Sequence, residues 1–251
     1  MKAFLLAAGL GTRLRPLTDS VPKCLLPIGG KPLLQIWLEH MQLHGVDEVL
    51  VNTHWLSEKV DDFLKGWNNG RVKVIAFHEP ILLGSAGTLK ANERWIAAGE
   101  PFFILYGDNY THVNLSGIAA FHRTHGLPFT LGIFRTKNPE RCGIAELAGD
   151  GTVKSFVEKP KAPRTDLAAA GIYVADGRIF DYFPAGIPGS PEPLDLGFHV
   201  IPRLVGKMKA YLIRESLLDI GTPESYEMAQ KIRANPGKAV DLAEAELAAF
   251  A

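Results

Sequence analysis

The chain is poor in cysteine and has no excess of charge of either sign. Cys24 and Cys142 are the only cysteines in 251 residues, which gives neither a disulfide framework nor a zinc-ligand spacing. Lysine plus arginine and aspartate plus glutamate both number 27, so the formal net charge is zero. A dedicated nucleic-acid binder usually carries a basic excess. We therefore expect a reduced, cytoplasmic protein that does not bind nucleic acid.

Long hydrophobic runs and repeats are also missing. No segment offers 18 uninterrupted apolar residues, and the apolar run before Gly9 is too short for a membrane span or a signal peptide. The hexapeptide repeats of a left-handed β-helix are absent as well. With 47% hydrophobic and 22% charged residues, the composition is that of an ordinary globular chain without a membrane partner.

The most informative segment is a basic, glycine-rich loop near the N-terminus. GLGTRLRPLT covers residues 9–18, PKCLLPI covers residues 22–28, and KP follows at residues 31–32. Residues 1–31 contain five lysines or arginines against one acid, Asp19, which is a local charge of +4. The string is neither GxxxxGK[ST] nor GxGxxG. Glycine amides and nearby cations bind phosphate oxygens well, so the segment predicts a polyanion site, with a triphosphate as the obvious ligand.

Strand-like and helix-like segments alternate in the first part of the chain. Continuous apolar runs predict strands at 2–8, 47–53, 71–77 and 101–108, with helices at 32–45, from Ser57 as cap to Gly66, and at 88–98. This alternation is typical of a parallel sheet with right-handed crossovers. Ligands bind outside the C-terminal ends of such strands, where the glycine loop and Asp108 both fall.

From about residue 128 the pattern changes to short alternating strands. Strands are predicted at 129–135, 142–147, 152–158, 168–175 and 209–215, with a hairpin turn at 148–151 and a loop at 184–193. Helices are expected at 196–206, from Thr222-Pro223, and at 241–250 after an Asp241 cap. The fold class is therefore α/β, a Rossmann-like three-layer sandwich with a mostly parallel mixed central sheet and a small antiparallel β insertion.

Several polar residues could carry chemistry. Asp108 and Asp219 each follow a predicted strand, and each is either a cap of the next segment or a metal ligand. Two isolated aspartates would suit Mg²⁺, because this ion prefers one or two carboxylates plus waters and phosphates. Glu158 and Lys159 end a strand before a proline. The histidine pairs have no carboxylate at ligand spacing, and we expect surface or boundary positions for His40 with His44 and His122 with His125.

The string GxGTRLRPLT-x3-PK-x-LLPI-x2-KP resembles the signature of the sugar-1-phosphate nucleotidyltransferases. The resemblance implies transfer of a nucleotidyl group from an NTP to a sugar 1-phosphate, with Mg²⁺ and release of pyrophosphate. It implies one nucleotidyltransferase domain over 1–251, with a nucleotide half at about 1–127, a sugar-phosphate half at about 128–230 that contains the β insertion, and a helical tail at about 231–251. No β-helix domain is expected, and a homo-oligomer is left open.

The resemblance also implies roles for individual residues. Catalysis falls to Arg13, Lys23 and Asp108, and the metal ligands are Asp108 and Asp219. The nucleotide is bound by Leu6, Ala8, Gly9, Gly11, Thr12, Arg13, Leu83 and Gly84. The sugar phosphate is bound by Gly143, Glu158, Lys159 and Gly171.

The choice of base and sugar depends on weaker features. The LGSAG segment at 83–87 is similar to that of mannose-1-phosphate guanylyltransferases, and Gly84 and Gly87 leave room for a purine, so GTP is expected. UTP or dTTP is the alternative, although Glu79 stands near the place of the glutamine that thymidylyltransferases usually have. Cys142 and Ala169 depart from the family pattern on the sugar side, where many relatives have tyrosine and asparagine.

Two other functions remain to be weighed. A glycosyltransferase would typically have a DxD motif, but Asn109 and Tyr110 follow Asp108, and the GTRLRP loop would be unexplained. A non-catalytic, sugar-nucleotide-binding regulatory subunit would be indicated by loss of Arg13, Lys23 or a metal aspartate, and all of these are present.

Overall fold

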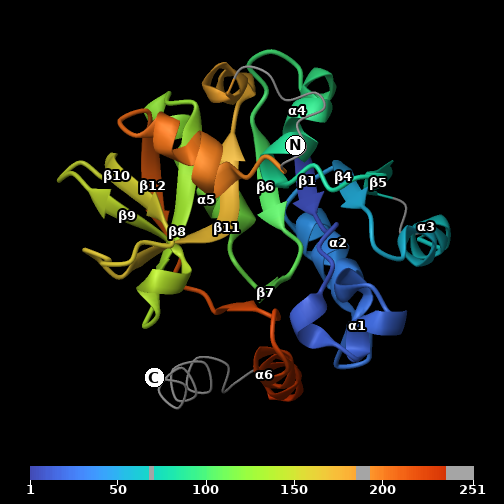
Figure 1. Cartoon of the computed structure of the whole chain (residues 1–251). Helices are drawn as coiled ribbons and strands as arrows, with labels where there is room; N and C mark the ends of the chain where they lie inside the picture. The colour runs from blue at the N-terminus through green and yellow to red at the C-terminus, as the bar shows by residue number, and fades with distance from the viewer. Residues whose placement is uncertain (68–70, 185–192, 236–251) are drawn as a thin grey trace. The chain divides into compact units, whose positions relative to one another are not determined.

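The computed structural model describes residues 1–67, 71–184 and 193–235, and the chain forms two compact units (Figure 1). Unit 1 comprises Met1–Phe4, Leu82–Leu105 and Leu115–Arg214. Unit 2 comprises Leu5–Ile81, Tyr106–Asn114 and Glu215–Ala251. The chain passes between the units within strands β1 (Lys2–Leu6) and β6 (Phe102–Tyr106), so neither unit is a continuous stretch of sequence.

Unit 1 is built on a mixed sheet. Strands β10, β9, β11 and β6 are neighbours in that order, and β8 pairs with both β11 and β12. The β10–β9, β11–β6 and β11–β8 pairs are antiparallel, whereas β12 and β8 are parallel. The bounds are β8 (Phe129–Arg135), β9 (Gly143–Leu147), β10 (Val153–Glu158), β11 (Leu167–Ala175), β12 (Met208–Leu212), α4 (Ser85–Ala91) and α5 (Leu115–His125).

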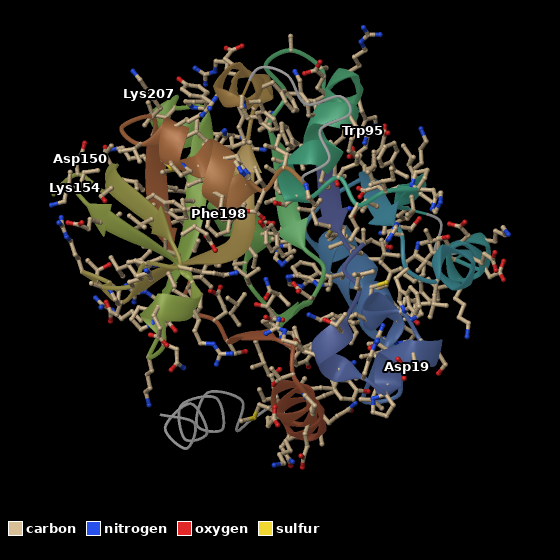
Figure 2. All side chains as sticks on the ribbon, in the orientation of Figure 1. Asp19, Trp95, Asp150, Lys154, Phe198 and Lys207 are labelled. Carbon is tan, nitrogen blue, oxygen red and sulfur yellow. The ribbon has the colours of Figure 1, made fainter. Side chains whose placement is uncertain are left out.

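The antiparallel insertion of unit 1 is the hairpin of β9 and β10. Its turn closes where the Gly151 amide donates to the Ala148 carbonyl at 3.0 Å, and Gly151 has a φ of 80° that favours glycine. Asp150 lies at the tip of this hairpin, with Lys154 nearby on β10 (Figure 2). The turn residues AGDG thus form the hairpin that the sequence predicts.

Unit 2 contains the parallel pair β4 and β5 and two short antiparallel pairs, β2 with β3 and β7 with β13. Helix α2 buries Leu34, Trp37 and Met41 on one face, as expected from apolar spacing of three and four residues. The bounds are β2 (Pro27–Ile28), β3 (Lys31–Pro32), β4 (Glu48–Thr53), β5 (Lys73–His78), β7 (Asn109–Thr111), β13 (Leu217–Asp219), α1 (Leu17–Ser20), α2 (Leu33–Leu43), α3 (Ser57–Lys65) and α6 (Pro223–Ala234).

The predicted α/β class with a mixed central sheet is confirmed, and the sheet is partly parallel. Each predicted strand is present, with ends shifted by up to three residues, and Phe129–Arg135 matches its predicted range. The predicted helix at 241–250 and most of the predicted loop at 184–193 lie outside the described residues. Among those described, no helix is long and apolar enough to cross a membrane.

Three predicted helical features are wrong. Ser57 is the first residue of α3 rather than its cap; Leu56, with a φ of 51°, takes that place without a side-chain cap. Helix α4 begins earlier and ends earlier than predicted, and a 3₁₀ turn at Glu93–Trp95 follows it. The predicted helix at 196–206 is a π turn at Leu196–Val200 and a 3₁₀ turn at Ile201–Leu204. Pro202 lies in that second turn, and because it has no amide proton it cannot continue a regular α-helix.

Candidate active site

Of the two glycines in the loop after β1, only Gly11 has a backbone conformation that favours glycine. Gly11 has a φ of 64°, and its carbonyl accepts a hydrogen bond from Thr18 Oγ1 at 2.7 Å. A Cβ at Gly11 would lie 2.8 Å from Thr18 Cγ2. Gly9 has no left-handed φ, and nothing lies within 4 Å of an added Cβ there. Arg13 extends from the 3₁₀ turn Thr12–Leu14 that begins after Gly11.

A buried polar chain fixes the start of this loop in unit 2. The Ala7 amide donates to Asn52 Oδ1 at 2.6 Å, and Asn52 Nδ2 donates to Glu79 Oε1 at 2.9 Å. Glu79 is 1% exposed. The Gly107 amide donates to the Leu6 carbonyl at 2.9 Å. Of the predicted nucleotide residues here, Leu6 ends β1, Ala8 lies in the loop, and Thr12 begins the 3₁₀ turn. Asn52 of β4 and Glu79 after β5 hold the loop at Ala7.

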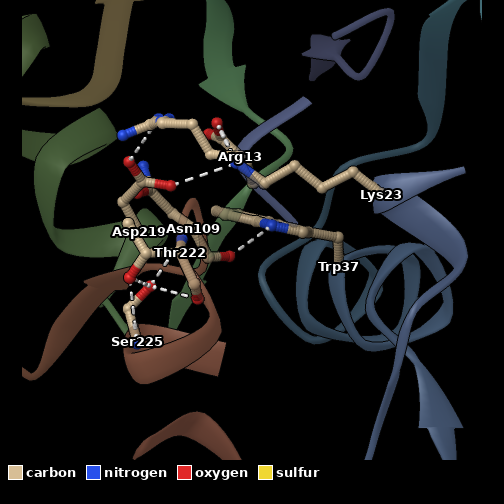
Figure 3. A network of polar contacts seen from close by, with 8 residues as sticks. Arg13, Lys23, Trp37, Asn109, Asp219, Thr222 and Ser225 are labelled. Atoms are coloured by element: carbon tan, nitrogen blue, oxygen red, sulfur yellow. Dashed lines mark hydrogen bonds and ion pairs between the residues drawn. The ribbon is translucent and has the colours of Figure 1, made fainter. Parts of the chain in front are cut away.

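The pairing of β7 with β13 brings the two predicted metal aspartates together. Asp219 lies opposite Asn109 in this antiparallel pair, and the Ile220 amide donates to the Asp108 carbonyl at 3.0 Å. Trp37 Nε1 donates to the Asn109 carbonyl at 2.8 Å and anchors β7 to α2 (Figure 3). Two carboxylates from distant parts of the sequence are therefore held in register by backbone hydrogen bonds.

The Lys23 ammonium lies between these two carboxylates. Its Nζ is 2.9 Å from Asp108 Oδ2 and 3.2 Å from Asp219 Oδ1, while Arg13 Nη2 is 3.9 Å from Asp219 Oδ2 (Figure 3). The Lys23 side chain is only 10% exposed, whereas those of Asp108 and Asp219 are 37% and 52% exposed. The structure thus brings together four predicted residues, Arg13, Lys23, Asp108 and Asp219, in unit 2.

Burial and charge act in opposite directions on the ionisable groups of this cluster. Burial alone would lower the pKa of Lys23, but the charges of Asp108 and Asp219 and the hydrogen bonds to them raise it overall. Desolvation and the neighbouring Asp108 carboxylate raise the pKa of Asp219, against the opposing effect of Lys23 and Arg13. The lysine is therefore firmly held as a cation.

Gly221 makes room for this cluster, and the sequence reasoning missed it. A Cβ at Gly221 would lie 2.7 Å from Arg13 Nη2 and 3.0 Å from both carboxylate oxygens of Asp219. The signal that could have found it is the string DIGTP, in which a glycine stands between the predicted ligand and a helix start. That start is a capping box in which the Ser225 amide donates to Thr222 Oγ1 at 3.2 Å and the Thr222 amide to Ser225 Oγ at 3.1 Å.

The donor set of unit 2 suits one kind of metal. Within the described residues, no group of three or more His, Cys, Asp or Glu side chains could hold an ion. Asp108 and Asp219 alone would not bind a structural zinc ion. A pair of carboxylates is, however, what Mg²⁺ uses when substrate phosphates and waters complete its coordination.

In unit 1, the LGSAG segment packs against Leu194. Gly84 has a φ of 80° and precedes α4. A Cβ at Gly84 would lie 2.5 Å from the Leu194 carbonyl oxygen, and one at Gly87 would lie 2.9 Å from Leu83 Cβ. The expectation that these two glycines leave room for a purine is therefore wrong for the space on their Cβ side, because protein atoms fill it.

Three of the four predicted sugar-phosphate residues of unit 1 lie together at the end of β10. Glu158 pairs with Gly143, and a Cβ at Gly143 would lie 2.5 Å from Glu158 Oε2. Lys159 has a φ of 48°, and its amide donates to the Cys142 carbonyl at 2.9 Å. Burial and then the charge of Asp195 raise the pKa of Glu158, against the effect of Lys159.

Two further predicted features of unit 1 have different outcomes. Gly171 has a φ of 67° and lies where the register between β11 and β8 shifts, a position that favours glycine. The expected surface or boundary position is wrong for His122, which is 6% exposed and bonded to Thr130 Oγ1 at 2.8 Å.

The sequence reasoning also missed Asp195, whose carboxylate accepts a hydrogen bond from Ser85 Oγ at 3.0 Å. No motif pointed to this residue.

Comparison with known proteins shows the family to which the chain belongs. The family model described as nucleotidyl transferase matches residues 2–235, and the chain belongs to this family. Mannose-1-phosphate guanylyltransferase 1 of Arabidopsis thaliana is 31% identical over 90% of this chain and 63% of its own length. The catalytic subunit beta of the Dictyostelium discoideum enzyme of the same name is 28% identical over 90% of this chain and 62% of its own length. The chain thus spans less than two thirds of these curated relatives.

Two solved structures share the fold. A Bacillus anthracis structure described as a glucose-1-phosphate thymidylyltransferase has a TM-score of 0.84 at 23% identity and covers 94% of this chain and 96% of that one. HddC of Yersinia pseudotuberculosis, crystallised with GMP-PN, has a TM-score of 0.72 at 26% identity over 92% of this chain and 98% of that one. The chain is therefore a nucleotidyltransferase in fold and family.

Proposed function

We propose that the chain transfers the guanylyl group of GTP to a sugar 1-phosphate and releases pyrophosphate, with Mg²⁺ as the metal. The observation that carries the proposal is the cluster of Lys23 and Arg13 with Asp108 and Asp219 in unit 2. The guanylyltransferase names of relatives about 30% identical support the choice of GTP.

The proposed chemistry needs no general base. The second pKa of a phosphate monoester is about 6, so the attacking oxygen of a sugar 1-phosphate is largely ionised at neutral pH. The barrier comes from bringing two polyanions together, and positioning with charge neutralisation lowers it. A cluster of cations and carboxylates without a nucleophilic side chain is consistent with this reaction.

Each charged residue of unit 2 then has a role. Arg13 and the backbone amides of the loop at 9–12 bind the triphosphate, and Lys23 neutralises the α-phosphate. Asp108 and Asp219 would hold Mg²⁺, which supplies further charge neutralisation at the phosphates when it is bound. The 10% exposure of the Lys23 side chain supports its role, because a desolvated ammonium interacts more strongly with a phosphate than an exposed one does.

Residues of unit 1 supply the remaining contacts. Lys159 binds the sugar phosphate, Glu158 accepts hydrogen bonds from the sugar, and Gly143 and Gly171 allow the sugar to approach the backbone. Leu83 and Gly84 contact the nucleoside. The division into a nucleotide half at about 1–127 and a sugar-phosphate half at about 128–230 remains part of the proposal.

The test is an array of GTP, UTP, dTTP, CTP and ATP against several sugar 1-phosphates, with pyrophosphate release measured in the presence of Mg²⁺. We expect GTP to give the highest kcat/KM. A preference for UTP or dTTP would overturn the choice of base but not the reaction. Nucleotide binding without turnover for every pair would instead favour the regulatory-subunit alternative.

The two lysines allow a sharper check of the roles. Lys159→Ala should mainly raise KM for the sugar phosphate, because it removes a ground-state contact to that substrate. Lys23→Met should mainly lower kcat or weaken nucleotide binding. The matched control is Lys161→Ala, an exposed lysine two residues beyond Lys159. A reversed pattern would show that the two substrate sites have been exchanged.

A further inference from the structure

The short segment Leu194–His199 connects two parts of unit 1 to which the proposed function gives different substrates. It pairs with the segment at 83–87, the proposed nucleoside contact. The Leu194 amide donates to the Leu83 carbonyl at 2.8 Å, and the amides of Ala86 and Gly87 donate to the Leu194 carbonyl at 2.8 and 3.1 Å. These bonds satisfy two of the free amides at the start of α4.

Asp195 adds a side-chain link to the same segment. Ser85 Oγ donates to Asp195 Oδ2 at 3.0 Å and accepts from the Leu196 amide at 2.8 Å. The other carboxylate oxygen, Oδ1, accepts from the Phe198 amide at 3.1 Å and caps the turn that begins at Leu196. One carboxylate therefore fixes both the position of Ser85 and the direction of the following turn.

That turn contacts the proposed sugar-phosphate residues. A Cβ at Gly197 would lie 2.8 Å from Glu158 Cδ and 3.2 Å from Asp195 Oδ1, so the Glu158 carboxylate rests directly against the glycine. Phe198, which lies on the turn (Figure 2), has its ring centre 6.0 Å from Lys159 Nζ. This is within the range of a cation–π contact.

We propose that Asp195 is a positioning residue. It fixes the positions of both the nucleoside-contact segment at 83–87 and the Glu158–Lys159 pair. The link to the first runs through Ser85, and the link to the second runs through the backbone at Gly197 and the ring of Phe198. The assignment of substrates to the two sides rests on the proposed function. Asp195 itself needs no contact with either substrate.

Three variants separate the two arms of this link. Ser85→Ala removes the two hydrogen bonds of Ser85 Oγ, to the Asp195 carboxylate and from the Leu196 amide. It should raise KM for the NTP about tenfold, the loss expected for a hydrogen bond to a charged group. Gly197→Ala pushes against Glu158 and should raise KM for the sugar 1-phosphate instead. Asp195→Ala removes the contacts to both segments and should raise both KM values. In each variant kcat should stay within about threefold of wild type.

Two further variants distinguish positioning from general structural damage. Asp195→Asn keeps one acceptor oxygen and should recover part of the Asp195→Ala loss. Asp150→Ala removes another acid of unit 1, paired with Lys209 at 2.9 Å at the hairpin tip, and should leave both KM values unchanged. Thermal unfolding of every variant identifies any that fail to fold.

The outcomes are decisive in either direction. Elevation of both KM values by Asp195→Ala, with the split between Ser85→Ala and Gly197→Ala, supports the proposal. A rise in only one KM for Asp195→Ala, or an Asp195→Ala variant that folds with both KM values unchanged, overturns it. If the wild type transfers no nucleotide, the proposed function fails, and calorimetric binding of GTP and of mannose 1-phosphate to the same variants tests the link separately.

Discussion

Lys23 neutralises the charge of the two aspartates in the cluster of unit 2. Its buried ammonium is shared by Asp108 and Asp219 at 2.9 and 3.2 Å. Asp108→Asn would leave this ammonium with one carboxylate, and we expect a loss of about 1–3 kcal/mol in the free energy of unfolding. Because the cause is a buried charge that is then compensated by Asp219 alone, adding Lys23→Met to Asp108→Asn should recover at least half of the loss.

Urea unfolding of the two variants, with pyrophosphate release as a second readout, checks this prediction. Turnover should fall by at least about 100-fold in both. Asp19→Asn is the control, because Asp19 forms an exposed pair with Arg15 at 3.2 Å and should change stability by less than about 1 kcal/mol. Near-normal turnover of Asp108→Asn at limiting Mg²⁺ would contradict the role given to Asp108.

His122 makes the stability of unit 1 depend on pH. Burial lowers the pKa of His122 to about 4, below the value near 6.5 expected in the unfolded chain. The unfolded state therefore binds the proton first as the pH falls, and stability is lost between pH 6.5 and pH 4. From pH 7 to pH 5 this one group should lower the free energy of unfolding by about 2 kcal/mol.

Chemical unfolding at pH 7, 6 and 5 measures the effect of His122. The variant His122→Gln keeps a polar group for Thr130 but cannot titrate, so its loss of stability over this range should be smaller by about the same amount. An unchanged pH dependence in His122→Gln would show that the histidine is not protonated preferentially in the unfolded chain.

At the level of helices and strands, local pattern predicted more than the contacts between segments. Alternating apolar residues predicted β8, and the turn residues AGDG predicted the β9–β10 hairpin. The start of α4 at Ser85 was missed because hydrogen bonds to Leu194, more than a hundred residues away, help fix it. The pairing of β7 with β13 was equally invisible, since each strand is only three residues long.

Helix α6 begins with a capping box, and its removal should be measurable. Thr222 Oγ1 accepts the Ser225 amide at 3.2 Å, so Thr222→Ala should lower the free energy of unfolding by about 1 kcal/mol. Ser57→Ala is the matched control, because α3 has no side-chain cap bond. Calorimetric melting compares the two; equal losses would mean that the Thr222 bonds do not stabilise the helix.

For the molecule as a whole, the N-terminal signature was enough to predict the family, and the resemblance named the charged residues that converge in unit 2. Their arrangement was not predictable, because the contact of Lys23 with both aspartates depends on β7, β13 and the turn at Lys23–Leu25 together. Asp195 and Gly221 belong to no periodic pattern, and their importance follows only from what lies beside them. The choice of sugar rests on contacts that the sequence pattern does not encode.

The lysine between the two aspartates means that the protein carries its own internal counter-ion. A chelator such as EDTA should therefore stop turnover without loosening the fold, and the melting temperature should stay within about 2 °C, unlike that of a protein folded around structural zinc. A drop of many degrees would contradict this. With Mg²⁺ as the proposed metal, we expect preparations stored in chelator to regain full activity when magnesium is added, so that the supply of metal switches activity while the fold is left intact.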